Sequence, residues 1–361
     1  MMLSKVFSEI QTAVLGLGLL ALSGAAVADC LTDVKKYRFD KELYNECIRE
    51  ANNTDNAELQ YLVALWNFAG VREVDFQTQR NMNGYKHFIH LAAQGGNLDA
   101  MSMYVITQYD RDNVENNGKD LNMVKYLNAL AEDKSPEGIL RMLVTKMQIG
   151  KFRETVELPE LVKLADEPDN LKAKFELARY YQSRVTPVDV RADLISKAYE
   201  YYKPIIESKS DDDNVRVMRG QSLWNMYGYY MKAKNAEEFA RAEPFLKQLA
   251  YSGDILAMGE YAVSYDTSRF GILDDSKAYA WAGRAMECSK GTIFENEYGS
   301  NEFFEKVNKK LSDEERKKGE AELAELRKSV KCIAQPKPKR PESEVKAKDP
   351  ADKKSDAGTQ K

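Results

Sequence analysis

The sequence predicts an all-α fold, a right-handed α-solenoid of about six antiparallel helix pairs with a C-terminal cap helix. Small residues recur between Phe245 and Gly291 at the positions where two neighbouring helices must touch. The same small or apolar position returns along the chain at separations of 35 to 44 residues. Almost no run of alternating β-branched residues interrupts this pattern, so we expect hardly any β-sheet.

The first 28 residues are predicted to be a signal peptide rather than part of the fold. Lys5 precedes an apolar run over residues 13–22, and a small-residue cleavage pattern ends at Ala28. That run is too short for a bilayer-spanning helix, which needs about 20 apolar residues. We therefore expect cleavage after Ala28 and a periplasmic or secreted protein that is not an integral membrane protein. Lipid attachment at Cys30 is disfavoured, because Asp29 stands where bacterial lipoprotein signals have a small residue.

The remaining chain is predicted to contain a helical body and a tail. Residues 29–56 are expected to form N-terminal capping helices, residues 57–292 the helical repeats, and residues 293–333 C-terminal capping helices. Residues 334–361 are rich in Pro, Lys, Asp and Ser and contain almost no bulky apolar residue. Such a segment buries too little surface to offset its ordering entropy, so we expect a disordered tail.

Each predicted repeat opens with an A helix, in which a small or apolar residue is followed by bulky residues four and about eight places later. The positions that open the A helices are Ala57, Ala100, Gly138, Ala173, Val217 and Ala257. The predicted B helices are Tyr85–Gln94, Asn122–Glu132, Leu158–Ala165, Val190–Glu207, Glu237–Tyr251 and Ser276–Ser289. Pro204 stands inside the fourth B helix and predicts a bend there.

The last repeat carries the clearest family likeness. Its A helix opens at Ala257 and closes at Tyr265, a loop runs from Gly271 to Asp275, and its B helix contains Lys277-Ala278-Tyr279-Ala280-Trp281. This phasing resembles a Sel-1-like repeat (SLR), a longer relative of the tetratricopeptide repeat. The resemblance implies an α-solenoid that mediates protein–protein interaction, since bacterial members look like scaffolds in envelope assembly, secretion, exopolysaccharide export and signalling.

A C-terminal cap helix is predicted after the last repeat, again as in the family. Ser312-Asp313-Glu314-Glu315 forms a capping box, in which the Ser312 hydroxyl and the Glu315 carboxylate each accept a hydrogen bond from the other residue's backbone. The helix that it opens is expected to run to about Val330, and Pro336 prevents it from continuing.

The four cysteines predict two disulfides and an oxidising compartment. No C-x-x-C pair is present to suggest zinc or redox chemistry. We expect the local pairs Cys30–Cys47 and Cys288–Cys332, because closing these loops costs less entropy than joining opposite ends of an elongated molecule. Each disulfide would clamp a terminal repeat that lacks a neighbour on one side.

Little in the sequence indicates catalysis, a cofactor or a nucleic-acid partner. The formal net charge is −4, whereas nucleic-acid binding requires a concentrated basic surface. His87 and His90 lie three apart on one helical face, but no third metal ligand is visible, so we expect no metal site. The run 211–213 of three aspartates lacks the alternation and the central Gly of a calcium loop. No nucleophile, zinc-protease or Walker motif occurs, so we expect no enzyme activity and no cofactor.

Aromatic side chains on the predicted A helices are the candidate binding residues: Tyr180, Trp224, Tyr227 and Tyr265. Tyr and Trp are frequent interface anchors, and solenoids bind partners along their concave surface. The alternative interpretation is that these aromatics fill the core between repeats.

The sequence thus favours a non-catalytic, exported adaptor that binds a protein or peptide in the cell envelope. A cell-wall or polysaccharide-binding protein, or a glycan-processing enzyme, is the alternative. That alternative requires aromatic platforms and a pair of carboxylates at one site.

Overall fold

The computed structural model describes residues 29–36, 39–71, 77–110, 117–184, 192–232, 236–290, 292, 294 and 300–333. The predicted signal peptide and the predicted tail lie outside these residues. The described chain consists of helices joined by turns and loops, which confirms the predicted all-α solenoid. None of the described helices is long and apolar enough to cross a membrane.

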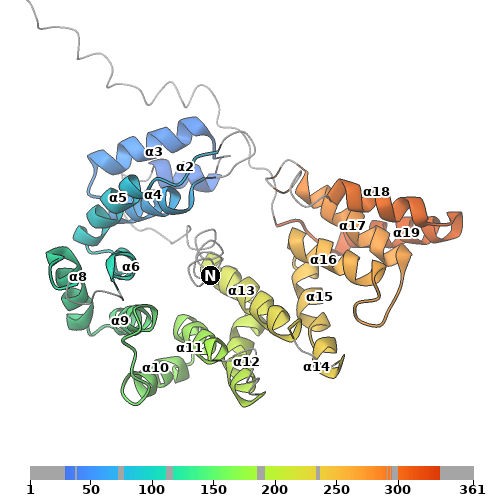
Figure 1. The fold of residues 1–361 in the computed structure, drawn as a ribbon. Helices are drawn as coiled ribbons and strands as arrows, with labels where there is room; N and C mark the ends of the chain where they lie inside the picture. The colour runs from blue at the N-terminus through green and yellow to red at the C-terminus, as the bar shows by residue number, and fades with distance from the viewer. Residues whose placement is uncertain are drawn as a thin grey trace, which may run out of the picture.

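Helix pairs follow one another along an open arch (Figure 1). The A helices are α4 (Ala57–Ala69), α6 (Leu98–Gln108), α9 (Pro136–Gln148), α11 (Leu171–Ser183), α13 (Asp213–Tyr230) and α16 (Ile255–Asp266). The B helices are α5 (Met82–Gln94), α8 (Leu121–Glu132), α10 (Glu157–Asp166), α12 (Ala192–Glu207), α14 (Ala236–Ala240) with α15 (Glu243–Tyr251), and α17 (Asp275–Ser289). Figure 1 shows α6, α11 and α13 towards the inside of the curve and α8, α10 and α12 towards its outside.

Further helices close the two ends. At the N-terminal end, α2 (Asp29–Lys36) and α3 (Lys41–Asn53) precede the first repeat. At the C-terminal end, α18 (Ser300–Lys310) and α19 (Asp313–Ser329) pack on α17. The predicted capping box at the start of α19 is present, with the hydroxyl of Ser312 and the carboxylate of Glu315 in reciprocal contact.

The A helices share a start signal that fixes where each of them begins. An Asn, Asp or Ser side chain caps each of them and accepts a hydrogen bond from the backbone N–H three residues later. In four repeats that third residue is Ala or Gly and is buried: Ala100, Gly138, Ala173 and Ala257. At Gly138 a small residue is needed, because the Asp133 side chain lies within 2.5 Å of where a Cβ of Gly138 would stand.

One prediction about the B helices differs from the structure. The predicted helix Glu237–Tyr251 is wrong as a single element, since it is divided into α14 and α15 by a turn at Arg241 and Ala242. Pro244 explains the division, because a proline cannot donate the helical hydrogen bond and its ring clashes with the carbonyl four residues earlier. Pro204, in contrast, lies in the last turn of α12, and the helix continues through it to Glu207.

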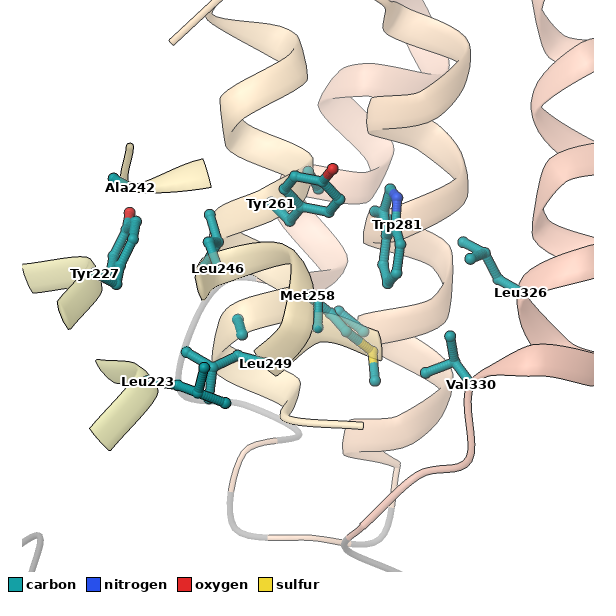
Figure 2. Close-up of a cluster of buried hydrophobic side chains, with 14 of the residues drawn as sticks. Leu223, Tyr227, Ala242, Leu246, Leu249, Met258, Tyr261, Trp281, Leu326 and Val330 are labelled. Atoms are coloured by element: carbon teal, nitrogen blue, oxygen red, sulfur yellow. The ribbon is translucent and has the colours of Figure 1, made fainter. Parts of the chain in front are cut away.

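The core runs between the layers of A and B helices and into the C-terminal cap. Its largest cluster runs from α11 to α19, and Figure 2 shows part of it, with side chains from Leu223 to Val330. A second cluster joins α2 to α8, and a third joins α9, α10 and α11. Each repeat therefore buries its apolar side chains mainly against its immediate neighbours, as in other solenoids.

Candidate functional site on the inner face of the arch

We call the surface formed by α4, α6, α9, α11, α13 and α16 the inner face. The four aromatic residues predicted to bind a partner all belong to these helices, but their burial differs. Tyr180 is 8% exposed and Tyr227 is 7% exposed, whereas Trp224 and Tyr265 are half-buried. Two of the four thus have too little accessible surface to act as anchors.

Tyr180 is a core residue at the end of α11. Its ring contacts Phe152 with a centroid distance of 5.2 Å and Tyr181 with one of 5.6 Å. The guanidinium of Arg184 covers it at 5.4 Å from the ring centroid. The predicted exposure of Tyr180 on the binding surface is therefore wrong, because residues from the loop before α10 and from the end of α11 enclose its ring.

Trp224 and Tyr227 are neighbours on α13, as their spacing predicts, with ring centroids 5.6 Å apart in an edge-on arrangement. Trp224 donates a hydrogen bond from Nε1 to Oδ2 of Asp254 at 2.9 Å. The ring of Tyr227 lies beside Ala242 and Leu246 in the core (Figure 2). Tyr227 is thus a structural residue, while Trp224 is only partly buried against the same core cluster.

The hydroxyl of Tyr227 reaches a charged pair at the edge of the inner face. It donates to Oε2 of Glu260 at 3.4 Å and accepts from Arg269 at 3.1 Å, and the same two charged side chains form an ion pair. Burial and the negative charge of Glu260 raise the pKa of Tyr227, so the phenol remains protonated at neutral pH. Tyr227 therefore serves as a fixed hydrogen-bonding group rather than as an acid or a base.

Tyr265 lies near the C-terminal end of α16. Its hydroxyl donates to the hydroxyl of Tyr261 at 3.2 Å, and the ammonium of Lys277 lies 5.3 Å from its ring centroid. Together with Trp224, Tyr265 is one of the two predicted aromatics that keep accessible surface on the inner face.

A chain of ion pairs, which was not predicted from the sequence, crosses three successive A helices. Arg141 on α9 places Nε 2.7 Å from Oδ1 of Asp99 on α6 and 2.9 Å from Oε1 of Glu137 on its own helix. Nζ of Lys172 on α11 lies 3.3 Å from both carboxylate oxygens of Glu137. We call Asp99, Glu137, Arg141 and Lys172 the charge ladder. Its two positive and two negative side chains balance, so the ladder carries no net charge.

The charge ladder is partly withdrawn from water. The side chains of Arg141 and Asp99 are 15% and 19% exposed, whereas those of Glu137 and Lys172 are each 39% exposed. Burial acts to lower the pKa of Arg141, but the charges of Asp99, Glu137 and nearby Glu176 outweigh it and raise the pKa. The arginine thus remains charged, and the ladder presents preset donors and acceptors rather than a group that exchanges protons.

The two histidines hold helices together and do not form a recognisable metal site. His87 Nε2 lies 3.1 Å from Oδ1 of Asn52, and His90 Nδ1 lies 2.8 Å from the hydroxyl of Tyr126. Over the described part of the chain, no group of three or more His, Cys, Asp or Glu side chains is arranged to hold a metal ion. In the aspartate run, Asp212 caps α13.

The carboxyl groups of Glu322 and Asp274 form the pair that is relevant to the alternative function, glycan processing. Burial and the charge of Asp274 raise the pKa of Glu322, as a general acid would require. Asp274 itself caps α17 and lies 3.5 Å from the ammonium of Lys318 and 3.8 Å from that of Lys277. Its carboxylate is therefore committed to a structural hydrogen bond and to two cations, and it supplies no free partner for acid–base catalysis.

Both disulfides join the cysteines that were predicted to pair. Cys30 and Cys47 link α2 to α3 with a Cα–Cα distance of 5.4 Å. Cys288 and Cys332 link α17 to the segment after α19 with a Cα–Cα distance of 5.2 Å. Two disulfides, one at each end of the described chain, are typical of proteins that fold in an oxidising compartment.

Comparison with known proteins finds similarity at the level of structure. No protein-family model matches the sequence, and no curated protein matches it significantly. The chain is similar to a protective antigen present in uropathogenic Escherichia coli strains that displays an SLR fold, with 14% identity and a TM-score of 0.35 over 81% of this chain. The chain spans 60% of that antigen's length. It is also similar to a Sel1 repeat protein from Oxalobacter formigenes, with 14% identity and a TM-score of 0.24, covering 87% of this chain and 99% of the other.

Proposed function

We propose that this protein is a non-catalytic, exported adaptor that binds a protein or an extended peptide along its inner face, in envelope assembly, secretion or signalling. The observation that carries the proposal is the charge ladder, which joins three successive A helices. Its members are fixed by one another and are still reached by water at Glu137 and Lys172.

The chemistry of the ladder suits a polypeptide. An extended peptide presents alternating N–H and C=O groups together with side chains of both signs. A neutral row of preset donors and acceptors can match such a ligand without a large change in net charge. Because the ladder is already ordered, little side-chain entropy is lost when a partner binds. The half-buried ring of Trp224, farther along the inner face, would add an aromatic anchor.

Export is supported by two independent features. The first 28 residues have the pattern of a cleavable leader, and the cysteines form two disulfides. The periplasm or the extracellular space would provide the oxidising conditions that these disulfides require. Peptide or protein partners in the cell envelope are therefore the expected ligands.

A matched pair of charge reversals tests the proposed binding surface. Lys172 lies on the inner face, and Lys163 is exposed on α10, a B helix. Affinity capture from the envelope fraction should identify a partner whose binding is weakened about tenfold by Lys172→Glu, equivalent to about 1.4 kcal/mol. Lys163→Glu should leave binding unchanged, and both variants should melt close to the wild-type temperature.

Photo-crosslinking locates the contact independently. A photoreactive amino acid at Trp224 should capture the same partner, whereas one at the exposed Lys203 on α12 should not. Equal loss of binding in both lysine variants, or cross-links from the outer position alone, would exclude the inner face. Hydrolysis of peptidoglycan by the purified protein, abolished by changing one carboxylate, would exclude a non-catalytic role.

A further inference from the structure

The two disulfides differ in their protection from solvent. Cys30 and Cys47 are 1% and 0% exposed and lie within the N-terminal core cluster. Cys288 is also buried, but Cys332 is only partly buried and stands between two exposed residues. Thiol–disulfide exchange requires an attacking thiolate to reach one of the two sulfur atoms. The C-terminal disulfide offers such an approach through Cys332.

Cys332 belongs to a short segment, Lys331–Ile333, which we call the strap. The strap crosses the turn between α15 and α16 at Gly253, and the N–H of Ile333 points to the carbonyl oxygen of Gly253 at 3.5 Å. The carbonyl oxygen of Lys331 lies only 2.0 Å from where a Cβ of residue 253 would stand. Gly253 also has a φ of +95°, a conformation that favours glycine. This turn is therefore shaped to receive the strap.

The turn under the strap is connected directly to the inner face. Asp254 follows Gly253 and uses both carboxylate oxygens: Oδ1 accepts from the N–H of Ala257 at 2.9 Å, and Oδ2 accepts from Nε1 of Trp224 at 2.9 Å. A change in the position of this turn thus alters both the start of α16 and the indole on α13. Gly253, which contacts the strap, and Asp254, which accepts the hydrogen bond from Trp224, are adjacent in the chain.

We propose that the Cys288–Cys332 disulfide is a reducible latch that holds the strap on the α15–α16 turn and so fixes Trp224 on the inner face. The reductant is a dithiol, such as a dithiol oxidoreductase of the compartment. When the latch opens, the strap leaves Gly253, Asp254 is no longer held in place, and the indole of Trp224 gains access to water. Any effect of the reduction on partner binding rests on the proposed function, whereas the movement of the strap, Asp254 and Trp224 does not.

The reduction transfers two electrons and two protons to the protein. A thiolate of the dithiol attacks Sγ of Cys332, forms a mixed disulfide and displaces the Cys288 sulfur, which takes up a proton. The second thiol of the reductant then attacks the mixed disulfide. Cys332 leaves as a thiol, and the reductant ends as its own disulfide.

Partial reduction of the purified protein tests the latch. Dithiothreitol treatment for increasing times, followed by alkylation and peptide mass spectrometry, should label Cys288 and Cys332 about tenfold faster than Cys30 and Cys47. Equal rates, or faster reduction of the N-terminal pair, would overturn the proposal.

Hydrogen exchange and fluorescence of the selectively reduced protein test the coupling. Exchange of backbone amides in residues 253–258 should increase, and tryptophan emission should shift to longer wavelength. The emission shift should be absent in Trp224→Phe, which leaves Trp66 and Trp281 as controls. The double variant Cys288→Ser/Cys332→Ser should show both changes without reductant, whereas Cys30→Ser/Cys47→Ser should show neither. Unchanged exchange at the turn, or an emission shift that persists in Trp224→Phe, would refute the coupling.

Discussion

Replacing Glu157 by glutamine removes a charge that is buried where α9 leads into α10. The Glu157 side chain is 2% exposed, accepts a hydrogen bond from the backbone N–H of Arg153 at 2.7 Å, and lies 3.0 Å from Nζ of Lys146. Burial acts to raise the pKa of Glu157, but the hydrogen bonds from Arg153 and Lys146 outweigh it and lower the pKa from 4.5 to about 2. The folded chain therefore holds this carboxyl in its ionised form more strongly than the unfolded chain does.

The expected loss of stability follows from that difference in pKa. A fall from 4.5 to about 2 corresponds to about 3 kcal/mol as an upper bound. The side chains of Arg153 and Lys146 are 67% and 28% exposed, so water screens part of the attraction. We expect Glu157→Gln to lower the free energy of unfolding by about 1–2 kcal/mol at pH 7. Because the folded-state pKa is depressed, this contribution is complete above pH 4.5 and is lost as the pH falls through 2.

Urea unfolding of both proteins between pH 2 and pH 7 measures this effect. The difference in unfolding free energy should be constant from pH 5 to pH 7 and should shrink steadily at lower pH. Glu160→Gln is the matched control, since Glu160 is exposed in the same first turn of α10. A difference as large at pH 2.5 as at pH 7, or an equal loss in Glu160→Gln, would refute the assignment of this stability to the buried carboxylate.

Two further substitutions test contacts in the repeats and under the strap. Arg141→Met should lower the free energy of unfolding by about 2–3 kcal/mol, because it leaves the partly buried Asp99 without its cation. Lys172→Met should lower it by less than about 1 kcal/mol, because Lys172 is more exposed. Equal losses of stability in thermal unfolding would contradict this difference in burial. Gly253→Ala should cost more than Gly271→Ala, which has a similar φ of +81° but nothing within 4 Å of an added Cβ. Gly271→Ala thus measures only the backbone cost of a positive φ, about 1 kcal/mol. Equal melting temperatures for the two variants would show that the strap makes no tight contact with Gly253.

The A helices could be predicted from sequence because their signals are local. A capping side chain and a small residue three places later lie within one turn of helix, as at Asn97 and Ala100. Neither signal depends on how far apart the repeats are. The division of α14 from α15 was also readable from Pro244, although the prediction placed one helix over residues 237–251.

The binding residues could not be predicted equally well, because exposure depends on neighbouring repeats. Tyr180 and Trp224 both lie on A helices, yet Phe152 and Arg184 cover the ring of Tyr180, while Trp224 donates a hydrogen bond to Asp254 and stays partly exposed. No local pattern distinguishes these environments. Aromatic enrichment on an A helix thus indicates packing between repeats as readily as it indicates a binding surface.

The charge ladder left a signal that was available in the sequence. Asp99, Glu137 and Lys172 each stand two residues after the capping side chain of their helix, and Arg141 and Glu176 each stand six residues after it. Aligning the A helices on their capping residues places these charges in adjacent rows. The buried small residue of each of these helices stands three places after the cap, so aligning on it gives the same rows, with the charges one residue before it and three residues after it.

The placement of the disulfides has a mechanical consequence for the whole arch. Covalent links secure the first and last helices, while the repeats from α4 to α16 are joined only by packing, hydrogen bonds and ion pairs. Terminal repeats of a solenoid usually open first, because each has only one neighbour. With both ends fastened, thermal bending is redistributed to the middle of the curve. Under the proposed function, it is therefore the spacing of the middle repeats that adjusts to the size of a bound partner.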